Sequence, residues 1–252
     1  MVRSPLKAPQ HVQALLDKLH KLSIEQESQL KGDKARFVST DVSGSADGAT
    51  PHKYLENDLN SKASLDDLMR DKFIALDEDK CHFVYQLIRA MGATNVIEAG
   101  TSFGVSTIYI ALAVSENKKD IDGRKLKPGV IATENEPSKA AKARQHWAEC
   151  GPEVEAEIDL REGNLLETLA SNVEQGVDLL LLDIWTPLAL PTVKLIQSKL
   201  RHGAVILTDH TLTAAEGYKE LLAYFEAPNS GFHNLTLPYS GGFEMTVYNP
   251  RK

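Results

Sequence analysis

The amino-acid sequence predicts an α/β fold with a doubly wound, mostly parallel sheet of seven strands. Short apolar runs recur between residues 95 and 210 at spacings of roughly 19 to 34 residues, and helical patterns separate them. Two of the runs, VDLLLL and AVIL, are continuously apolar, which is typical of strands covered on both faces. Residues 232–249 contain two further strand patterns around a Ser-Gly-Gly turn, which predicts a C-terminal antiparallel hairpin.

The apolar runs define the parallel strands that we expect. They are NVIEA at 95–99, GVIATE at 129–134, IDLREG at 158–163, VDLLLLDIW at 177–185 and GAVILTDH at 203–210. Pro137 and Pro187 fit the first turn of the helices that follow the second and fourth runs, because a helix does not use that N–H. Strand and helix therefore alternate, as in successive βα units.

The N-terminal region carries a different pattern, and we expect a helical extension over 1–92 and a core domain over 93–252. Apolar residues recur three and four apart in residues 11–31, which predicts an amphipathic helix with one buried face. Residues 32–52 are rich in Gly, Ser, Asp and Thr and predict a loop. A second apolar stripe predicts a helix that ends at Gly92. The extension is expected to form a lid, a homodimer contact, or neither.

Composition narrows the class of partner. The 252 residues include 28 bases and 35 acids, and the net charge of −7 gives no general field that attracts nucleic acid. The two cysteines lack metal-ligand spacing. No signal-peptide pattern and no run of about 18 apolar residues is found. We therefore expect a cytoplasmic protein that acts on a small molecule, without a nucleic-acid or membrane partner.

The turn after the first predicted strand, EAGTSFGVS, has the features of a cofactor site. In doubly wound sheets, ligands bind outside the carboxyl ends of the strands. Gly100 and Gly104 allow the backbone to approach a ligand, and the following helix offers free N–H groups. The spacing G-x-x-x-G differs from the dinucleotide motif G-x-G-x-x-G. Glu98 would repel a pyrophosphate and attract an amino group, which favours a ligand with an amine.

The second predicted strand supplies a partner for a ribose. It ends at Glu134, whose carboxylate can accept hydrogen bonds from both ribose hydroxyls. A ligand with an amine, a carboxylate and ribose hydroxyls fits these residues better than a dinucleotide, and S-adenosylmethionine (SAM) has all three.

Five motifs carry a resemblance to a known family. E-x-G-x-x-x-G-x-S, T-E-N-E-P, R-E-G-N, L-L-D-I-W and L-T-D-H resemble those of the Rossmann-like small-molecule O-methyltransferases of the catechol and caffeoyl-CoA type, over about residues 72 to 249. The resemblance implies methyl transfer from SAM to a hydroxyl of a small, phenolic or catechol-like acceptor. The cofactor-binding residues that it implies are Glu98, Gly100, Thr101, Gly104, Ser106, Glu134, Asn164, Asp183 and Trp185.

Two carboxylates end neighbouring predicted strands. Asp183 and Asp209 would face one crevice, where like charges must be protonated, hydrated or bridged by a cation. The resembling family binds a magnesium-type ion here through two aspartates and an asparagine, and His210 replaces the asparagine in this chain. We therefore predict that Asp183, Asp209 and His210 bind a divalent metal (Mg, Mn or another transition metal), and that Asp183 and His210 are catalytic.

A second departure from the family leaves the identity of the general base undetermined. Thr186 stands where the catechol enzymes carry a lysine, and threonine is no base at neutral pH. Either a metal acidifies the acceptor hydroxyl, or His210 or His233 accepts its proton. The alternatives are a metal-independent methyltransferase on another small molecule and a cofactor-binding protein without catalysis. An adenine N-methyltransferase is disfavoured, because Asp183 is followed by Ile-Trp-Thr rather than Pro-Pro-aromatic.

Overall fold

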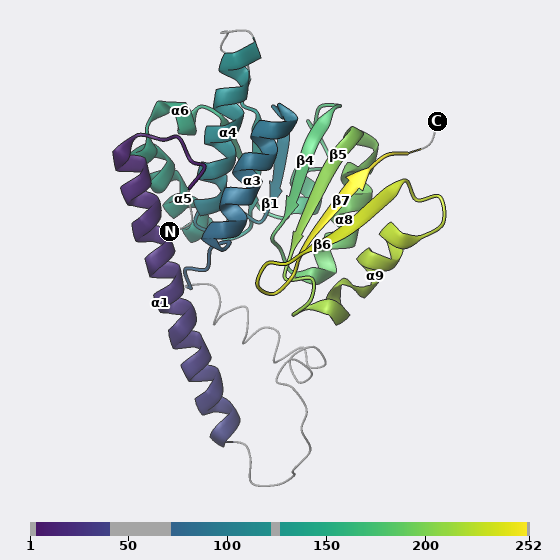
Figure 1. Ribbon diagram of the computed structural model, residues 1–252. Helices are drawn as coiled ribbons and strands as arrows, with labels where there is room; N and C mark the ends of the chain where they lie inside the picture. The colour runs from purple at the N-terminus through teal and green to yellow at the C-terminus, as the bar shows by residue number, and fades with distance from the viewer. Residues whose placement is uncertain (1–3, 41–71, 122–126, 251–252) are drawn as a thin grey trace. The chain divides into compact units, whose positions relative to one another are not determined.

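The computed structural model describes residues 4–40, 72–121 and 127–250, and Figure 1 shows their arrangement. A seven-stranded sheet has the strand order β3-β2-β1-β4-β5-β7-β6. Its strands are β1 (Val96–Ala99), β2 (Val130–Glu134), β3 (Ile158–Glu162), β4 (Val177–Leu182), β5 (Leu200–Asp209), β6 (Phe232–Leu237) and β7 (Phe243–Tyr248). The strands β1 to β5 are parallel, and β7 pairs antiparallel with both β5 and β6. The predicted Rossmann-like sheet and its C-terminal hairpin are confirmed.

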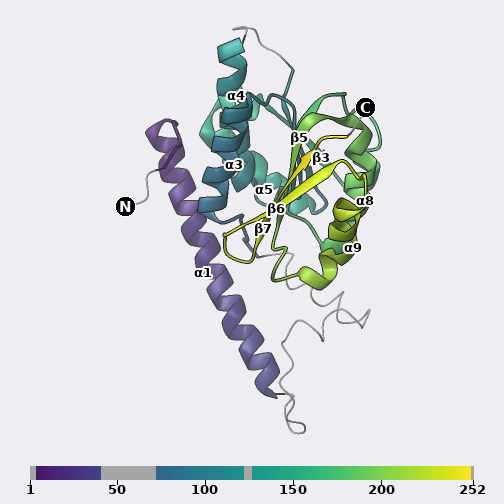
Figure 2. The ribbon, with the colours of Figure 1, turned by 45° about the vertical axis from the view of Figure 1, so that its right-hand side comes forward.

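Helices cover both faces of this sheet. They are α3 (Glu78–Met91), α4 (Val105–Ile121), α5 (Pro137–Cys150), α6 (Pro152–Glu155), α7 (Leu165–Thr168), α8 (Thr186–Ile196) and α9 (Ala215–Glu226), with a 3-10 turn, η2 (Gln197–Lys199). Figures 1 and 2 show α3 and α4 on one face and α8 and α9 on the other. Pro137 and Pro187 lie in the first turns of α5 and α8, as predicted. α3 ends at Gly92, which adopts the left-handed conformation that favours glycine.

The core explains why the strands read as apolar runs. All four residues of β1 are buried, and four consecutive leucines of β4 are buried as well. One large cluster joins the sheet to α8 and α9, and it contains Leu180, Ile206 and Phe225. Because the strands are covered on both faces, polar side chains that serve a ligand are restricted to the strand ends.

The chain divides into two compact units, one of Met1–Asp17 with Ala75–Lys252 and one of Lys18–Ile74. α3, which the sequence assigns to the N-terminal extension, lies in the first unit together with the sheet. The proposed boundary between residues 92 and 93 stays a prediction, as do the roles of the extension as a lid or dimer contact.

The predicted N-terminal helix is confirmed and is longer than expected. α1 (Gln10–Thr40) begins one residue before the predicted range and buries Val12, Leu15 and Leu16. It continues through the first nine residues of the segment predicted as a loop, so that part of the prediction was wrong. The sequence GDKARFVST contains good helix formers, which outweigh its glycine and serine once a helix is already present. Residues 41–52 of the predicted loop lie outside the described residues.

Within the described parts of the chain, no helix combines the length and apolarity that crossing a membrane requires.

Candidate active site at the carboxyl ends of the strands

Glu98 is the centre of the β1–α4 turn. Its side chain is completely buried, and its carboxylate accepts hydrogen bonds from Thr101 Oγ1 at 2.5 Å, Ser106 Oγ at 2.6 Å and Thr107 Oγ1 at 2.5 Å. Burial raises the pKa of Glu98, against the opposing effect of these three hydroxyl donors. Glu98 therefore holds the turn together through its neighbours, and direct contact of Glu98 and Ser106 with the methionine part of SAM stays a prediction.

Two glycines allow the turn to pack closely against neighbouring segments. Gly100 has a φ of +88°, and a Cβ there would lie 2.1 Å from the carbonyl oxygen of Asp183. Gly104 has a φ of +79°, and its Cβ would lie 2.4 Å from Nε1 of Trp147. That indole nitrogen instead donates a hydrogen bond to the Gly104 carbonyl at 3.0 Å. The first glycine thus brings the predicted cofactor turn against the end of β4.

Glu134 is fixed at the end of β2. Its Oε2 accepts a hydrogen bond from the backbone N–H of Ser102 at 2.7 Å, and its Oε1 accepts one from Glu136 N–H at 2.8 Å. The side chain is half-buried, so it is not closed off from a ligand. Both of its oxygens keep a lone pair for a further donor, which is what the predicted bonds to two ribose hydroxyls require.

Asn164 and Trp185 differ in how free their side chains are. Asn164 caps α7, where its Oδ1 accepts from Leu166 N–H at 3.0 Å and its Nδ2 donates to Glu167 Oε1 at 3.2 Å. Its predicted contact with adenine stays a prediction. Trp185 precedes α8 and is 45% exposed, which is unusual for so large an apolar side chain. Thr186 packs against α9, where a Cβ on Gly217 would lie 2.3 Å from Thr186 Oγ1.

Asp183 and Asp209 end adjacent strands, as predicted. Leu182 of β4 lies opposite Thr208 of β5, so the two aspartates occupy the next pair of positions. Burial, and then the charge of Asp209, raises the pKa of Asp183 to about 7. Among the described residues, none donates a hydrogen bond to the Asp183 carboxylate, which leaves it the freer of the two.

Lys80 is the residue of this site that the sequence analysis missed. Its side chain is 0% exposed, and its Nζ lies 2.7 Å from Asp209 Oδ1 and 2.9 Å from Asp77 Oδ2. Nζ also lies 5.9 Å from the ring centre of Phe243. Burial disfavours the charged ammonium, but the hydrogen bond and charge of Asp209 raise the pKa of Lys80 overall. The site therefore contains a buried cation supplied by the chain.

His210 completes a row of three residues with Lys80 and Asp209. Its Nδ1 lies 2.8 Å from Asp209 Oδ2, and the hydrogen bond to Asp209 raises the pKa of His210. Its backbone has a φ of +60°, and a Cβ on Gly241 would lie 3.1 Å from His210 Cδ2, so the hairpin turn makes room for the ring. The imidazole is 57% exposed. Asp209 thus holds one ring nitrogen while the ring edge stays accessible.

His233, the other predicted proton acceptor, lies elsewhere in the sheet. It pairs with Val247, which pairs with Val205, four residues before Asp209 in β5. Four residues of strand correspond to roughly 13 Å. The structure therefore brings His210, and not His233, to the strand ends.

The predicted metal ligands come together, but their geometry does not fit a divalent ion. Both oxygens of Asp209 are already engaged, Oδ1 by Lys80 Nζ and by His210 N–H at 2.8 Å, and Oδ2 by the imidazole of His210. Despite burial, which favours the neutral acid, these contacts hold the pKa of Asp209 below its usual range. No group of three His, Cys, Asp or Glu side chains is placed to hold a metal in the described ranges.

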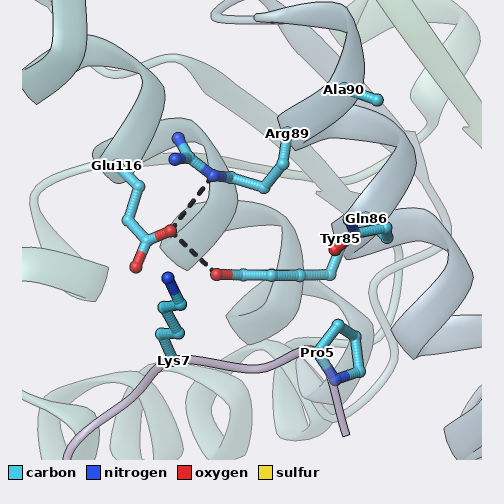
Figure 3. Close-up of a pocket in the computed structure, with 7 residues that line it drawn as sticks. All are labelled: Pro5, Lys7, Tyr85, Gln86, Arg89, Ala90 and Glu116. Carbon is cyan, nitrogen blue, oxygen red and sulfur yellow. Dashed lines mark hydrogen bonds and ion pairs between the residues drawn. The ribbon is translucent and has the colours of Figure 1, made fainter.

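A separate cavity of 320 Å³ lies between the N-terminal segment, α3 and α4 (Figure 3). Glu116 is one of the residues that line it. Its carboxylate accepts a hydrogen bond from Tyr85 OH at 2.8 Å and pairs with Arg89 Nε at 3.1 Å. These residues lie toward the C-terminal ends of α3 and α4, whereas the strand ends adjoin the start of α4. The cavity is therefore not part of the candidate active site.

Comparison with known proteins agrees with this geometry. Residues 97–211 match the family model of a methyltransferase domain, a range that extends from β1 past the end of β5. Over this range the chain is similar to that methyltransferase domain, and the solved structures share its Rossmann-like fold.

Individual relatives are O-methyltransferases by name. The chain is 28% identical to the catechol O-methyltransferase of Niastella koreensis over 145 residues, which are 55% of this chain and 59% of that protein. The chain thus spans less than two thirds of the length of this relative. The O-methyltransferase TomG from Streptomyces achromogenes, solved in complex with SAM, has a TM-score of 0.60 and 21% identity, covering 78% of this chain and 92% of TomG. The O-methyltransferase from Bacillus cereus, solved in complex with SAH, has a TM-score of 0.59 and 19% identity, covering 85% of this chain and 96% of that one. The resemblance predicted from the sequence is confirmed.

Proposed function

We propose that this protein transfers the methyl group of SAM to a hydroxyl group of a small acceptor. The observation that carries the proposal is the contact between Gly100 and the carbonyl oxygen of Asp183, because it brings two turns together. One is the turn predicted to hold the methionine part of SAM. The other follows β4, and the neighbouring strand β5 ends at the row of Lys80, Asp209 and His210. A methyl donor and a proton acceptor would then meet at one edge of the sheet.

The cofactor would lie across the carboxyl ends of β1 and β2. The fixed carboxylate of Glu134 supports ribose binding, because both of its oxygens are oriented by backbone donors. The N-terminus of α4, where Ser106 lies, supports binding of the methionine carboxylate. The names of the solved relatives bound to SAM and SAH support the same cofactor.

The acceptor we propose is apolar around its hydroxyl, in keeping with a phenolic or catechol-like molecule. Trp185 is 45% exposed two residues after Asp183, and Leu212 is 65% exposed two residues after His210. Large apolar side chains that are exposed close in sequence to the polar residues of the site favour a flat, apolar ligand.

The chemistry requires one proton acceptor. In an in-line displacement the acceptor oxygen forms a bond to the methyl carbon, the bond from that carbon to sulfur breaks, and the sulfonium becomes a neutral thioether. The hydroxyl proton must leave the oxygen. Asp209 holds Nδ1 of His210, so Nε2 is the nitrogen that would accept this proton. This arrangement supports the metal-independent version of the reaction over the metal-assisted one, because a metal on Asp209 would lie close to the Lys80 ammonium.

An acceptor screen with methyl-labelled SAM tests the proposal. Phenols, catechols and aliphatic alcohols of similar size would be compared, and products would be identified by mass spectrometry. We expect label in a phenolic product. SAM binding by calorimetry, without methyl transfer to any hydroxyl compound, would instead support a cofactor-binding protein without catalysis.

A further inference from the structure

We infer that the Lys80 ammonium is the resident cation of this site and occupies the place predicted for a divalent metal. The inference deepens the proposed function, but it concerns metal binding and can be tested without turnover. It follows from two features: the burial of Lys80 and the use of both Asp209 oxygens.

Lys80 is placed by the fold itself. It lies in the first turn of α3 and, with Val84 and Ile88, forms a buried stripe at a spacing of four residues. The stripe directs the lysine toward the end of β5, where Nζ meets Asp209 Oδ1 at 2.7 Å. A fully buried ammonium is costly unless it is paired, and here two carboxylates pair it.

Three of the roughly four acceptor positions of the Asp209 carboxylate are already used. One oxygen accepts from the lysine and from a backbone N–H, and the other accepts from the imidazole of His210. A divalent ion bound to Asp209 would therefore lie close to Nζ of Lys80, and the repulsion between the two cations would oppose binding. The ammonium also neutralises one of the two converging carboxylates, which removes the charge that a metal would otherwise balance.

The role that we infer for Lys80 differs from that of a lysine in an ordinary buried ion pair. Lys118 is also buried and pairs with Glu157, but it lies near the end of α4, far from the strand ends. Of these two lysines, Lys80 is the one that contacts a residue of the predicted metal set. This contrast supplies a matched control, because both lysines are buried and each has a carboxylate partner.

Titration of the full-length chain with Mn²⁺, followed by the electron paramagnetic resonance signal of free Mn²⁺, tests the inference. Lys80→Met keeps the apolar stem and removes the charge. We expect it to bind one Mn²⁺ at least about tenfold more tightly than the wild type, a difference of about 1.4 kcal/mol. Adding Asp209→Asn should abolish the gain, and Lys118→Met should show none.

Two results would overturn the inference. One is stoichiometric Mn²⁺ binding by the wild type that Asp209→Asn removes, since the lysine would then not exclude the metal. The other is a folded Lys80→Met protein, judged by circular dichroism, that gains no affinity. If Lys80→Met does not fold, the comparison of the wild type with Asp209→Asn decides alone. Failure to find methyl transfer would remove the proposed function and leave these results unaffected.

Discussion

Asp209 joins Lys80 and His210 by using a different oxygen for each side chain. Oδ1 lies 2.7 Å from Nζ of the lysine, and Oδ2 lies 2.8 Å from Nδ1 of the histidine. The carboxylate therefore orients the imidazole from one side and is itself held from the other. An oriented imidazole at the end of a strand is the arrangement that a general base needs.

Replacing His210 by alanine should remove that base. We expect kcat to fall by about 100- to 10,000-fold, the usual contribution of a positioned general base. SAM affinity should stay within about twofold, because the predicted cofactor contacts lie on β1 and β2. Steady-state kinetics and calorimetry measure the two quantities. His233→Ala is the control and should change neither, and an unchanged kcat in His210→Ala would show that the base is elsewhere.

Gly100→Ala should disrupt the packing of the cofactor turn on β4. Its Cβ would lie 2.1 Å from a backbone oxygen, which cannot move aside as a flexible side chain could. Gly176→Ala is a matched control, because Gly176 has a φ of +86° and no atom near its missing Cβ. We expect the first variant to lose about 1 to 3 kcal/mol more unfolding free energy than the second. Equal losses in urea denaturation would mean that only the backbone angle matters.

Glu134→Ala should weaken SAM binding. A charge-assisted hydrogen bond contributes about 1.5 to 3 kcal/mol, so we expect affinity to fall by about 10- to 150-fold. Glu162, at the end of the neighbouring strand β3, is exposed and pairs with Arg144, so Glu162→Ala serves as the control. Calorimetry in which both variants bind SAM like the wild type would remove Glu134 from the cofactor site.

Glu98→Gln should change how stability depends on pH. Burial raises the pKa of Glu98 above its ordinary value of 4.5, so the folded state holds this proton more tightly than the unfolded state. The contribution of Glu98 to the free energy of unfolding is therefore fully present below pH 4.5 and is lost as pH rises through the folded pKa. Glutamine cannot titrate. Relative to Glu98→Gln, the wild type should lose stability as the pH rises above 4.5 and through the folded pKa. If the denaturation midpoints of the wild type and of Glu98→Gln differed by a constant amount over that range, the raised pKa of Glu98 would be contradicted.

The sheet could be predicted because its strands are buried on both faces. Continuous apolar runs such as those of β4 and β5 are typical of buried strands and of few other structures. Gly100 and Gly104 mark a turn whose glycines are needed for close packing. The end of α1 could not be predicted, because a segment of Gly, Ser and Asp reads as a loop even where helix formers separate them.

Lys80 escaped prediction for a different reason. Lysine is rarely buried, and its partner Asp209 is 129 residues away in sequence, so no local pattern joins them. The available signal was its position four residues before Val84, on the apolar stripe of α3. Thr107 was also missed, because its hydrogen bond to Glu98 forms only in the folded turn and no sequence pattern indicates it. A charged residue on a predicted buried face was therefore the clue to this site.

The most direct test of the proposed function is the position of the transferred methyl group. Chelator-treated protein would be incubated with a phenolic acceptor and SAM carrying a ¹³C-labelled methyl group, and the product would be analysed by nuclear magnetic resonance. We expect a methyl carbon bonded to the phenol oxygen, formed at the same rate before and after chelation. A methyl group on nitrogen or carbon, or no product although SAM is bound, would contradict the account.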